Sequence, residues 1–216
     1  MKPTLPSPTP EITPSKKNAL SHFQRWSSTY ERSWLQQRFF DPAQQAMLEV
    51  MKHHLPTQPS NVLDVGCGTG RLLRLIHERW PDADLIGIDP TSGMVEAAQQ
   101  MLPDATFEVS FAEALPVPDA SVDVAVSTFS FHHWSDPGAG LREVVRVLRP
   151  TGHFFLVDVA LPVWLSRLLP WSHFRNPAQV RTLFQQAGLH VLHQQTAAPG
   201  HALITIGKIE NAPGGK

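Results

Sequence analysis

Cysteine is almost absent from this sequence. The 216-residue chain contains one, Cys67, so an internal disulfide cannot form and a small, disulfide-stapled secreted fold is excluded. Cys67 lies between two glycines, where only a small side chain fits. We therefore expect it to fill space rather than to act as a nucleophile.

An excess of one charge and long apolar runs are absent too. Lys and Arg number 18 against 19 Asp and Glu, so no overall field draws in nucleic-acid phosphates. Three arginines on one predicted helix (Arg142, Arg146 and Arg149) are expected to form a solvated face. No run reaches the roughly 18 apolar residues of a membrane span, and the N-terminal stretch lacks the apolar centre of a signal peptide. We expect a cytoplasmic protein with no nucleic-acid partner.

The ends of the chain differ from its middle. Residues 1–17 are rich in proline and predict a disordered arm, and residues 211–216 predict a flexible tail. The length of the stretch between them, residues 18–210, suits a single domain. Within it we expect a helical, aromatic-rich cap over residues 18–56 and an α/β core over residues 57–210.

Short apolar runs alternate with amphipathic helices from Asn61 onward. Strands are predicted at Asn61–Val65, Asp84–Asp89, Thr106–Val109, Val122–Ser127, Phe154–Asp158, Leu189–His193 and Ala202–Ile209. Helices are predicted at Arg71–Trp80, at Ser92–Met101, from the Asp136-Pro137 cap to Pro150, and from the Asn176-Pro177 cap to Gly188. Strands separated by helices predict a mostly parallel sheet. The last two strands have no helix between them, so the final strand should be antiparallel. We predict a Rossmann-like, doubly wound, seven-stranded α/β fold.

A glycine-rich loop follows the first predicted strand, in VLDVGCGTGRLL (Val62–Leu73). A P-loop would end in Gly-Lys-Ser/Thr, but here Gly70 is followed by Arg71. A dinucleotide fingerprint would need a glycine in the sixth position from Gly66, and that position is Arg71. The loop therefore disfavours a P-loop nucleotide site and an NAD site.

Asp64, followed by Gly-x-Gly-x-Gly, resembles motif I of the class I S-adenosylmethionine-dependent methyltransferases. The resemblance extends from about Phe23 to Gly207 and is closest to the small-molecule group that includes ubiquinone/menaquinone-type enzymes. It implies S-adenosylmethionine as cofactor and S-adenosylhomocysteine as product. The glycine backbone would lie against the methionine part, the next helix N-terminus would face its carboxylate, and Asp64 would suit its ammonium group.

Further stretches extend this resemblance along the chain. Asp89, in LIGIDPTSGM, would accept both ribose hydroxyls, because two carboxylate oxygens match a cis-diol. Phe111 stands where the family often has an aspartate, which weakens the expected adenine contact beside it. The resemblance assigns these residues to the cofactor: Asp64, Gly66, Cys67, Gly68, Gly70, Asp89, Pro90, Met94, Ala112, Glu113, Ser127 and, from the cap, Tyr30.

Two adjacent histidines, His132 and His133, follow the predicted fourth strand, where the resemblance places the methyl acceptor. Histidine titrates near neutral pH and suits a general base, and we favour His133 over His132 for this role. The alternative is that one histidine orders the loop or binds the cofactor and the other is exposed. We expect no metal site, because adjacent side chains diverge and no carboxylate pair completes a ligand set.

The apolar segment at residues 161–174 follows the fifth predicted strand. It is an ordinary core helix, a lid over a hydrophobic acceptor, or a patch that touches a membrane. We expect methyl transfer to a small hydrophobic or aromatic acceptor, at oxygen or carbon, by a monomer or homodimer. The alternatives are a non-catalytic S-adenosylmethionine-binding protein and an NAD-dependent oxidoreductase.

Overall fold

One sheet forms the centre of the molecule in a computed structural model that describes residues 40–159, 174–197 and 202–209. Within these residues, seven strands lie in the order β3-β2-β1-β4-β5-β7-β6. The strands are β1 (Asn61–Val65), β2 (Asp84–Asp89), β3 (Thr106–Val109), β4 (Val122–Thr128), β5 (Leu148–Val159), β6 (Leu189–Ala197) and β7 (Ala202–Ile209). The helices are α2 (Asp41–His54), α3 (Arg71–Arg79), α4 (Ser92–Met101), the short 3-10 turn η2 (Phe131–His133), α5 (Pro137–Val147) and α7 (Pro177–Gln186).

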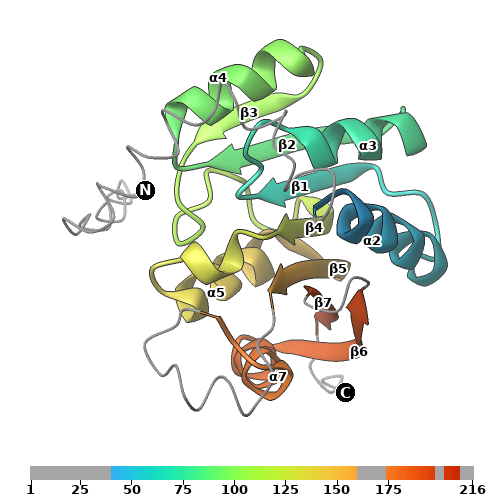
Figure 1. The fold of residues 1–216 in the computed structure, drawn as a ribbon, viewed down its shortest axis with the longest axis vertical. Helices are drawn as coiled ribbons and strands as arrows, with labels where there is room; N and C mark the ends of the chain where they lie inside the picture. The colour runs from blue at the N-terminus through green and yellow to red at the C-terminus, as the bar shows by residue number, and fades with distance from the viewer. Residues whose placement is uncertain (1–39, 160–173, 198–201, 210–216) are drawn as a thin grey trace, which may run out of the picture.

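The strand directions agree with the prediction. Strands β3, β2, β1, β4 and β5 run parallel to one another, and β7 pairs antiparallel with both β5 and β6. In Figure 1 the sheet runs from α4 and β3 at the top to α7 and β6 at the bottom. The Rossmann-like sheet with an antiparallel last strand is confirmed.

Helices cover both faces of the sheet. Helices α2, α3 and α4 share one apolar core, and α5 and α7 share the other. Successive strand residues point to opposite faces, so Val62 belongs to the first core and Leu63 to the second. Both faces of the sheet are therefore buried, which explains why its strands read as continuous apolar runs.

The main differences from the predicted boundaries are that β5 begins at Leu148 instead of Phe154 and that β6 extends beyond His193. Helix α5 ends at Val147, because Leu148 is already extended (φ −69°, ψ 138°) and pairs with Val122 at the start of β5. The proline at position 150 disfavours helical backbone in the residue before it. Strand β6 continues to Ala197, where it still pairs with Ala202 of β7.

Several predicted segments lie outside the described residues: the arm at 1–17, the first part of the cap, the stretch 160–173 and the tail at 211–216. The described part of the cap is α2, which buries Met47 and Met51 against the sheet. No helix in the described ranges combines the length and apolar character needed to cross a membrane.

Two glycines of α5 differ in the space around them, and this predicts opposite effects on stability. A Cβ at Gly140 would collide with the ring of Trp134, so Gly140→Ala should destabilise the fold by about 1–3 kcal/mol. At Gly138 the nearest atoms are Asp136 Oδ1, the N-cap acceptor of α5, at 3.2 Å and the flexible end of Arg142 at 3.4 Å, and neither is close enough to collide. Gly138→Ala should be neutral or gain up to about 1 kcal/mol from helix propensity. Urea unfolding midpoints measure both, and equal effects would contradict the packing argument.

Candidate active site

The strand order reverses between β1 and β4, and this reversal opens a crevice at the carboxyl ends of the two strands. An open pocket of about 350 Å³ lies there. It is lined by the loop after β1, by the end of β4 and by α2: Phe40, Gln44, Gly66, Cys67, Gly68, Thr69, Arg71, Thr128 and Phe129. The glycine loop thus lies where open α/β sheets bind ligands.

Two glycines of this loop are required for different reasons. Gly66 has φ +80°, and a Cβ there would collide with the side chain of Ser130. Gly68 has φ +53° and faces open space. Gly66 therefore allows the protein to pack against itself, whereas Gly68 leaves room for a ligand to approach the backbone.

Hydroxyl groups join the loop after β1 to the turn after β4. Ser127 and Ser130 both donate to the carbonyl of Val65, at 2.8 and 2.9 Å, and their hydroxyl oxygens lie 2.7 Å apart. The Trp134 indole N–H donates to Ser130. The Ser127 side chain is fully buried in these contacts and joins the end of β4 to the loop after β1.

Asp64 is a buried carboxylic acid with an unused acceptor. Its side-chain Oδ1 has no hydrogen-bond partner, and the residue is only 1% exposed. Burial and, to a smaller extent, the negative charge of Asp89 raise the pKa of Asp64 to about 8. A cation beside it would favour the charged form again, so this position fits an ammonium group.

Asp89 is held by backbone N–H groups of two loops, the one after β1 and the one after β2. Its Oδ2 accepts from the N–H of Gly68 at 3.0 Å, and its Oδ1 accepts from the N–H of Thr91 at 2.9 Å. Burial raises the pKa of Asp89, and these hydrogen bonds act in the opposite direction. The residue predicted to bind ribose therefore also orders the glycine loop.

Other residues assigned to the cofactor are placed as follows. Met94 and Ala112 are buried and Pro90 is half-buried. Burial, with the charge of Asp64, raises the pKa of the Cys67 thiol well above its ordinary value, which opposes nucleophilic chemistry. Glu113 accepts a hydrogen bond from the Asp136 N–H at 2.9 Å. Gly70 caps α3, and Tyr30 lies outside the described residues.

The two histidines occupy different environments. His132 Nδ1 lies 2.7 Å from Asp158 Oδ1, and its backbone N–H donates to Asp158 Oδ2 at 2.8 Å. The His132 and Asp158 side chains are 14% and 9% exposed, whereas His133 is exposed. A carboxylate that accepts from Nδ1–H leaves Nε2 as the proton acceptor of the ring.

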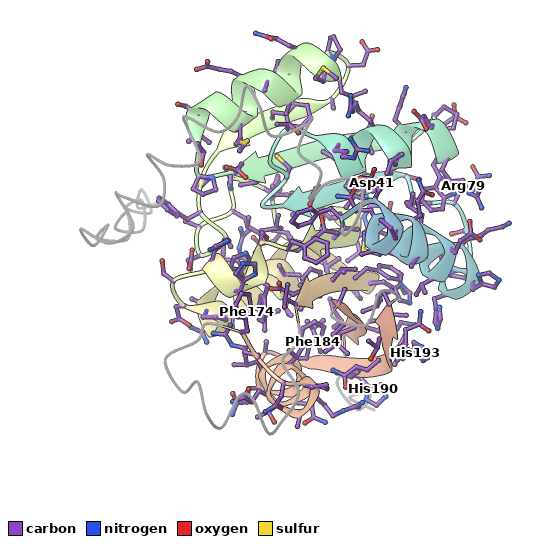
Figure 2. The ribbon with its side chains drawn as sticks, in the orientation of Figure 1. Asp41, Arg79, Phe174, Phe184, His190 and His193 are labelled. Carbon is purple, nitrogen blue, oxygen red and sulfur yellow. The ribbon has the colours of Figure 1, made fainter. Side chains whose placement is uncertain are left out.

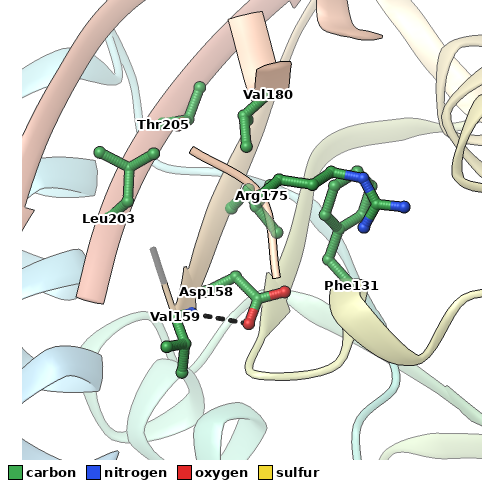
Figure 3. Close-up of a pocket in the computed structure, with 8 residues that line it drawn as sticks. Phe131, Asp158, Val159, Arg175, Val180, Leu203 and Thr205 are labelled. Carbon is green, nitrogen blue, oxygen red and sulfur yellow. Dashed lines mark hydrogen bonds between the residues drawn. The ribbon is translucent and has the colours of Figure 1, made fainter. Parts of the chain in front are cut away.

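A second pocket lies beside this pair, at the carboxyl end of β5 (Figure 3). Asp158 and Phe131 form part of its wall, and the Arg175 guanidinium lies 5.2 Å from the centre of the Phe131 ring. Burial lowers the pKa of Arg175, and Asp158 acts in the opposite direction. His132 thus stands beside a pocket with an aromatic wall.

The sequence analysis did not identify three residues of the site: Asp158, which contacts His132, and Gln44 and Arg71, which line the first pocket. Asp158 is the clearest, because an acidic residue near the carboxyl end of a strand beside the fourth strand was a usable signal. Gln44 and Arg71 carried no such signal, since their place in the pocket depends on how α2 packs. Among the described residues, no group of three metal-ligating side chains forms.

Comparison with known proteins agrees with this geometry. Residues 63–156 match the family model described as "Methyltransferase domain". A relative from Thermotoga maritima named demethylmenaquinone methyltransferase is 33% identical over 150 residues, which are 68% of this chain and 64% of that protein. The chain therefore spans less than two thirds of that relative's length.

Solved structures share the fold at lower identity. A SAM-dependent methyltransferase from Aquifex aeolicus superposes with a TM-score of 0.67 at 23% identity and covers 87% of this chain and 97% of its own. The [4+2]-cyclase SpnF gives a TM-score of 0.68 at 19% identity, over 78% of this chain and 81% of its own.

Residues 63–156 therefore form a methyltransferase domain, in agreement with the resemblance to the class I S-adenosylmethionine-dependent methyltransferases. The residues present fit S-adenosylmethionine. Asp64 Oδ1 is buried without a partner and suits its ammonium group, and the open face of Gly68 admits its methionine part.

The raised pKa of Asp64 predicts that the stability of the cofactor-free protein depends on pH. In the folded state the pKa is about 8, against 3.8 ordinarily, so the folded state binds more protons between these values. Stability contributed by this group therefore falls as pH rises through that window. Asp64→Asn cannot ionise, so its stability relative to wild type should be higher at pH 8 than at pH 5. Thermal unfolding without cofactor at the two pH values measures this difference.

Asp123 offers a control, because its pKa is shifted in the opposite direction to that of Asp64. Burial would raise its pKa, but hydrogen bonds from Arg149 and from the backbone N–H groups of Asn61 and Ser60 outweigh burial and lower it. Asp123 is then charged at both pH values, so Asp123→Asn should lose similar stability at each. If Asp64→Asn changes the stability by the same amount at pH 5 and pH 8, the raised pKa of Asp64 is wrong.

Proposed function

We propose that this protein transfers a methyl group from S-adenosylmethionine to a small hydrophobic or aromatic acceptor, with His132 as general base. The observation that carries the proposal is the 2.7 Å contact between His132 Nδ1 and Asp158, at the carboxyl edge of β4 and β5. When bound, the cofactor supplies an electrophilic methyl group on a sulfonium.

Each residue then has a limited task, because alignment contributes much of the catalysis in such a displacement. Asp64 and Asp89 bind the ammonium and ribose groups of the cofactor. His132 Nε2 takes the proton from an O–H or acidic C–H of the acceptor. Asp158 stabilises the resulting imidazolium and keeps Nδ1 protonated, and the backbone N–H of Val159, 2.7 Å from Asp158 Oδ1, holds that carboxylate in place.

Two observations support an aromatic acceptor such as a quinol. The His132 ring lies 4.8 Å from the Phe174 ring, and Phe131 lines the adjoining pocket. The Thermotoga maritima relative carries the name demethylmenaquinone methyltransferase. A lid or membrane contact by residues 161–174, a monomeric or homodimeric state and the lack of a nucleic-acid partner remain parts of this proposal.

A non-catalytic cofactor-binding protein is the main alternative. SpnF has the same fold and is named a [4+2]-cyclase, so the fold alone does not specify methyl transfer. An NAD-dependent oxidoreductase is disfavoured because Arg71 stands where the dinucleotide fingerprint has its last glycine.

Calorimetric titration separates these functions at the level of the cofactor. We expect micromolar binding of S-adenosylhomocysteine and no binding of NAD. Methyl transfer is then screened with radiolabelled S-adenosylmethionine against quinols, phenols and lipids. Folded protein that binds NAD but not S-adenosylhomocysteine would overturn the proposal. Binding without transfer to any acceptor class would favour the non-catalytic alternative.

The two histidines should differ sharply in their contribution to turnover. His132→Ala should lower kcat by about 10²–10⁴-fold, because it removes the proton acceptor, whereas His133→Ala should stay within a few-fold of wild type. Asp158→Asn should lower kcat while leaving the affinity for S-adenosylhomocysteine unchanged. Initial rates with the acceptor found in the screen measure all three variants. A larger loss in His133→Ala than in His132→Ala would assign the base to His133.

A further inference from the structure

The second pocket, at the carboxyl end of β5, differs from the pocket over the glycine loop in size and in the chemistry of its wall. It is an open pocket of about 260 Å³, against about 350 Å³ for the other. Pockets for drug-sized ligands usually reach roughly 300–1,000 Å³, so this volume suits a smaller molecule of about one ring. Most of its wall is apolar, and its polar residues are Asp158, Arg175 and Thr205.

Two of these three polar residues are already engaged by neighbouring groups. The Asp158 carboxylate contacts His132 Nδ1 at 2.7 Å and accepts from the backbone N–H groups of His132 and Val159, at 2.8 and 2.7 Å. The fully buried Thr205 hydroxyl accepts from a side-chain amide of β6 at 3.2 Å. These contacts tie both residues to the protein, so the guanidinium of Arg175 supplies the positive charge of the pocket.

Arg175 is held in place by the backbone on one side and by an aromatic ring on the other. It directly precedes Asn176, whose capping box fixes the start of α7. Its guanidinium lies 5.2 Å from the centre of the Phe131 ring, and Phe131 is fully buried against Trp134 (Figure 3). An aromatic ring attracts the charge of a guanidinium but does not replace the oxygen acceptors that its N–H groups prefer. The planar fork of Arg175 therefore suits the two oxygens of a carboxylate.

Burial makes an anion beside Arg175 favourable. The side chain is half-buried, and burial lowers the pKa of Arg175 while Asp158 acts in the opposite direction. A ligand carboxylate would favour the charged guanidinium again. The neighbouring wall is formed by Leu156, Val180 and Leu203, which suit the apolar body of a ligand and not a second charge.

A ligand held at Arg175 lies close to the proposed base. Phe174, the residue before Arg175, has its ring centre 4.8 Å from that of His132, and Figure 2 shows Phe174 at the side of the molecule that carries α5. Asp158 contacts His132 and also lines the pocket. An aromatic acid bound by its carboxylate at Arg175 can therefore present a hydroxyl group towards His132.

We propose that the methyl acceptor is a small aromatic acid and that Arg175 binds its carboxylate in the second pocket. This inference rests on the proposed function and narrows its acceptor from aromatic compounds in general to those that carry an anionic group. It makes Arg175 a specificity-determining residue, supplied by a segment outside the matched residues 63–156.

A matched pair of probes tests for recognition of the anion. The compounds meta-hydroxybenzoate and meta-hydroxybenzamide have similar size and shape, and only the first is charged at neutral pH. Calorimetric titration of the full chain saturated with S-adenosylhomocysteine should show the benzoate binding about 10–100-fold more tightly, as expected for hydrogen bonds between charged groups. Arg175→Met should bring this ratio close to one and leave the affinity for the benzamide within a few-fold of wild type. Arg175→Lys should give an intermediate ratio, because lysine keeps the charge but lacks the planar fork.

Arg181 provides a matched control on the helix that follows Arg175. It lies in α7, donates to Gln194 Oε1 at 2.9 Å and does not line the pocket. Arg181→Met removes the same charge from the same part of the protein, so the ratio of the two affinities should remain that of wild type. A ratio that falls as far in Arg181→Met as in Arg175→Met would assign the preference to the general electrostatic field and would contradict the inference.

The outcomes distinguish this inference from the proposed function. If wild-type protein binds the two compounds equally or binds neither, or if Arg175→Met weakens both equally, the inference is wrong. Binding of S-adenosylhomocysteine by each variant shows that the variant is folded, and the cofactor assignment survives in all of these cases. Failure of the proposed function has a different signature, which is folded wild-type protein that does not bind S-adenosylhomocysteine.

Discussion

The contact between Gly66 and Ser130 is the constraint on which both halves of the site depend. Because Gly66 has no Cβ, the Ser130 side chain can lie against the loop after β1 and donate to the Val65 carbonyl. Two residues further on, His132 binds Asp158 at the end of β5. One short turn is thus fixed at one side to the glycine loop and at the other to Asp158, which lines the second pocket.

The same turn contains strained backbone. Phe129 has φ +53°, which is uncommon for a residue with a side chain, and its N–H donates to the Val157 carbonyl at 2.8 Å. Its ring packs edge-on against Phe40, next to α2. Such conformations persist where the surroundings hold them, and they concentrate at functional sites. Here the strain directs one aromatic ring towards the cofactor pocket and the next, Phe131, towards the second pocket.

The three buried carboxylates of the site differ in the hydrogen-bond donors around them, and each therefore suits a different role. Asp64 has an unpaired oxygen, so burial raises its pKa to about 8 and leaves it ready for a cation. Asp89 is satisfied by backbone N–H groups and can order a loop while keeping lone pairs for hydroxyls. Asp158 is satisfied by His132 and by backbone, so its charge serves an imidazole. The differences arise from the neighbouring donors and not from the side chains themselves.

Local signals were enough to predict the sheet, the glycine loop and the caps. The Asp136 side chain accepts from the Ala139 N–H at 3.0 Å, and Asn176 forms a full capping box, as expected from short-range chemistry. Asp158 was a visible candidate at the end of a predicted strand, but its contact with His132 could not be predicted, because that contact depends on the pairing of Thr128 with Val157 between two strands. The sequence shows which residues form both strands but not how the strands pair. Without that register, nothing indicates which of His132 and His133 has a carboxylate partner.

The residues matched by the family model, 63–156, contain only part of the candidate site. They contain the glycine loop, Asp89 and both histidines, whereas α2 precedes them and Asp158 and Arg175 follow them. The family match therefore covers most of the residues that the resemblance assigns to the cofactor, together with both histidines. Outside it, Asp158 contacts His132 and lines the second pocket together with Arg175, and α2 lines the pocket over the glycine loop. Since these residues come from segments flanking the match, the family match by itself leaves the acceptor open.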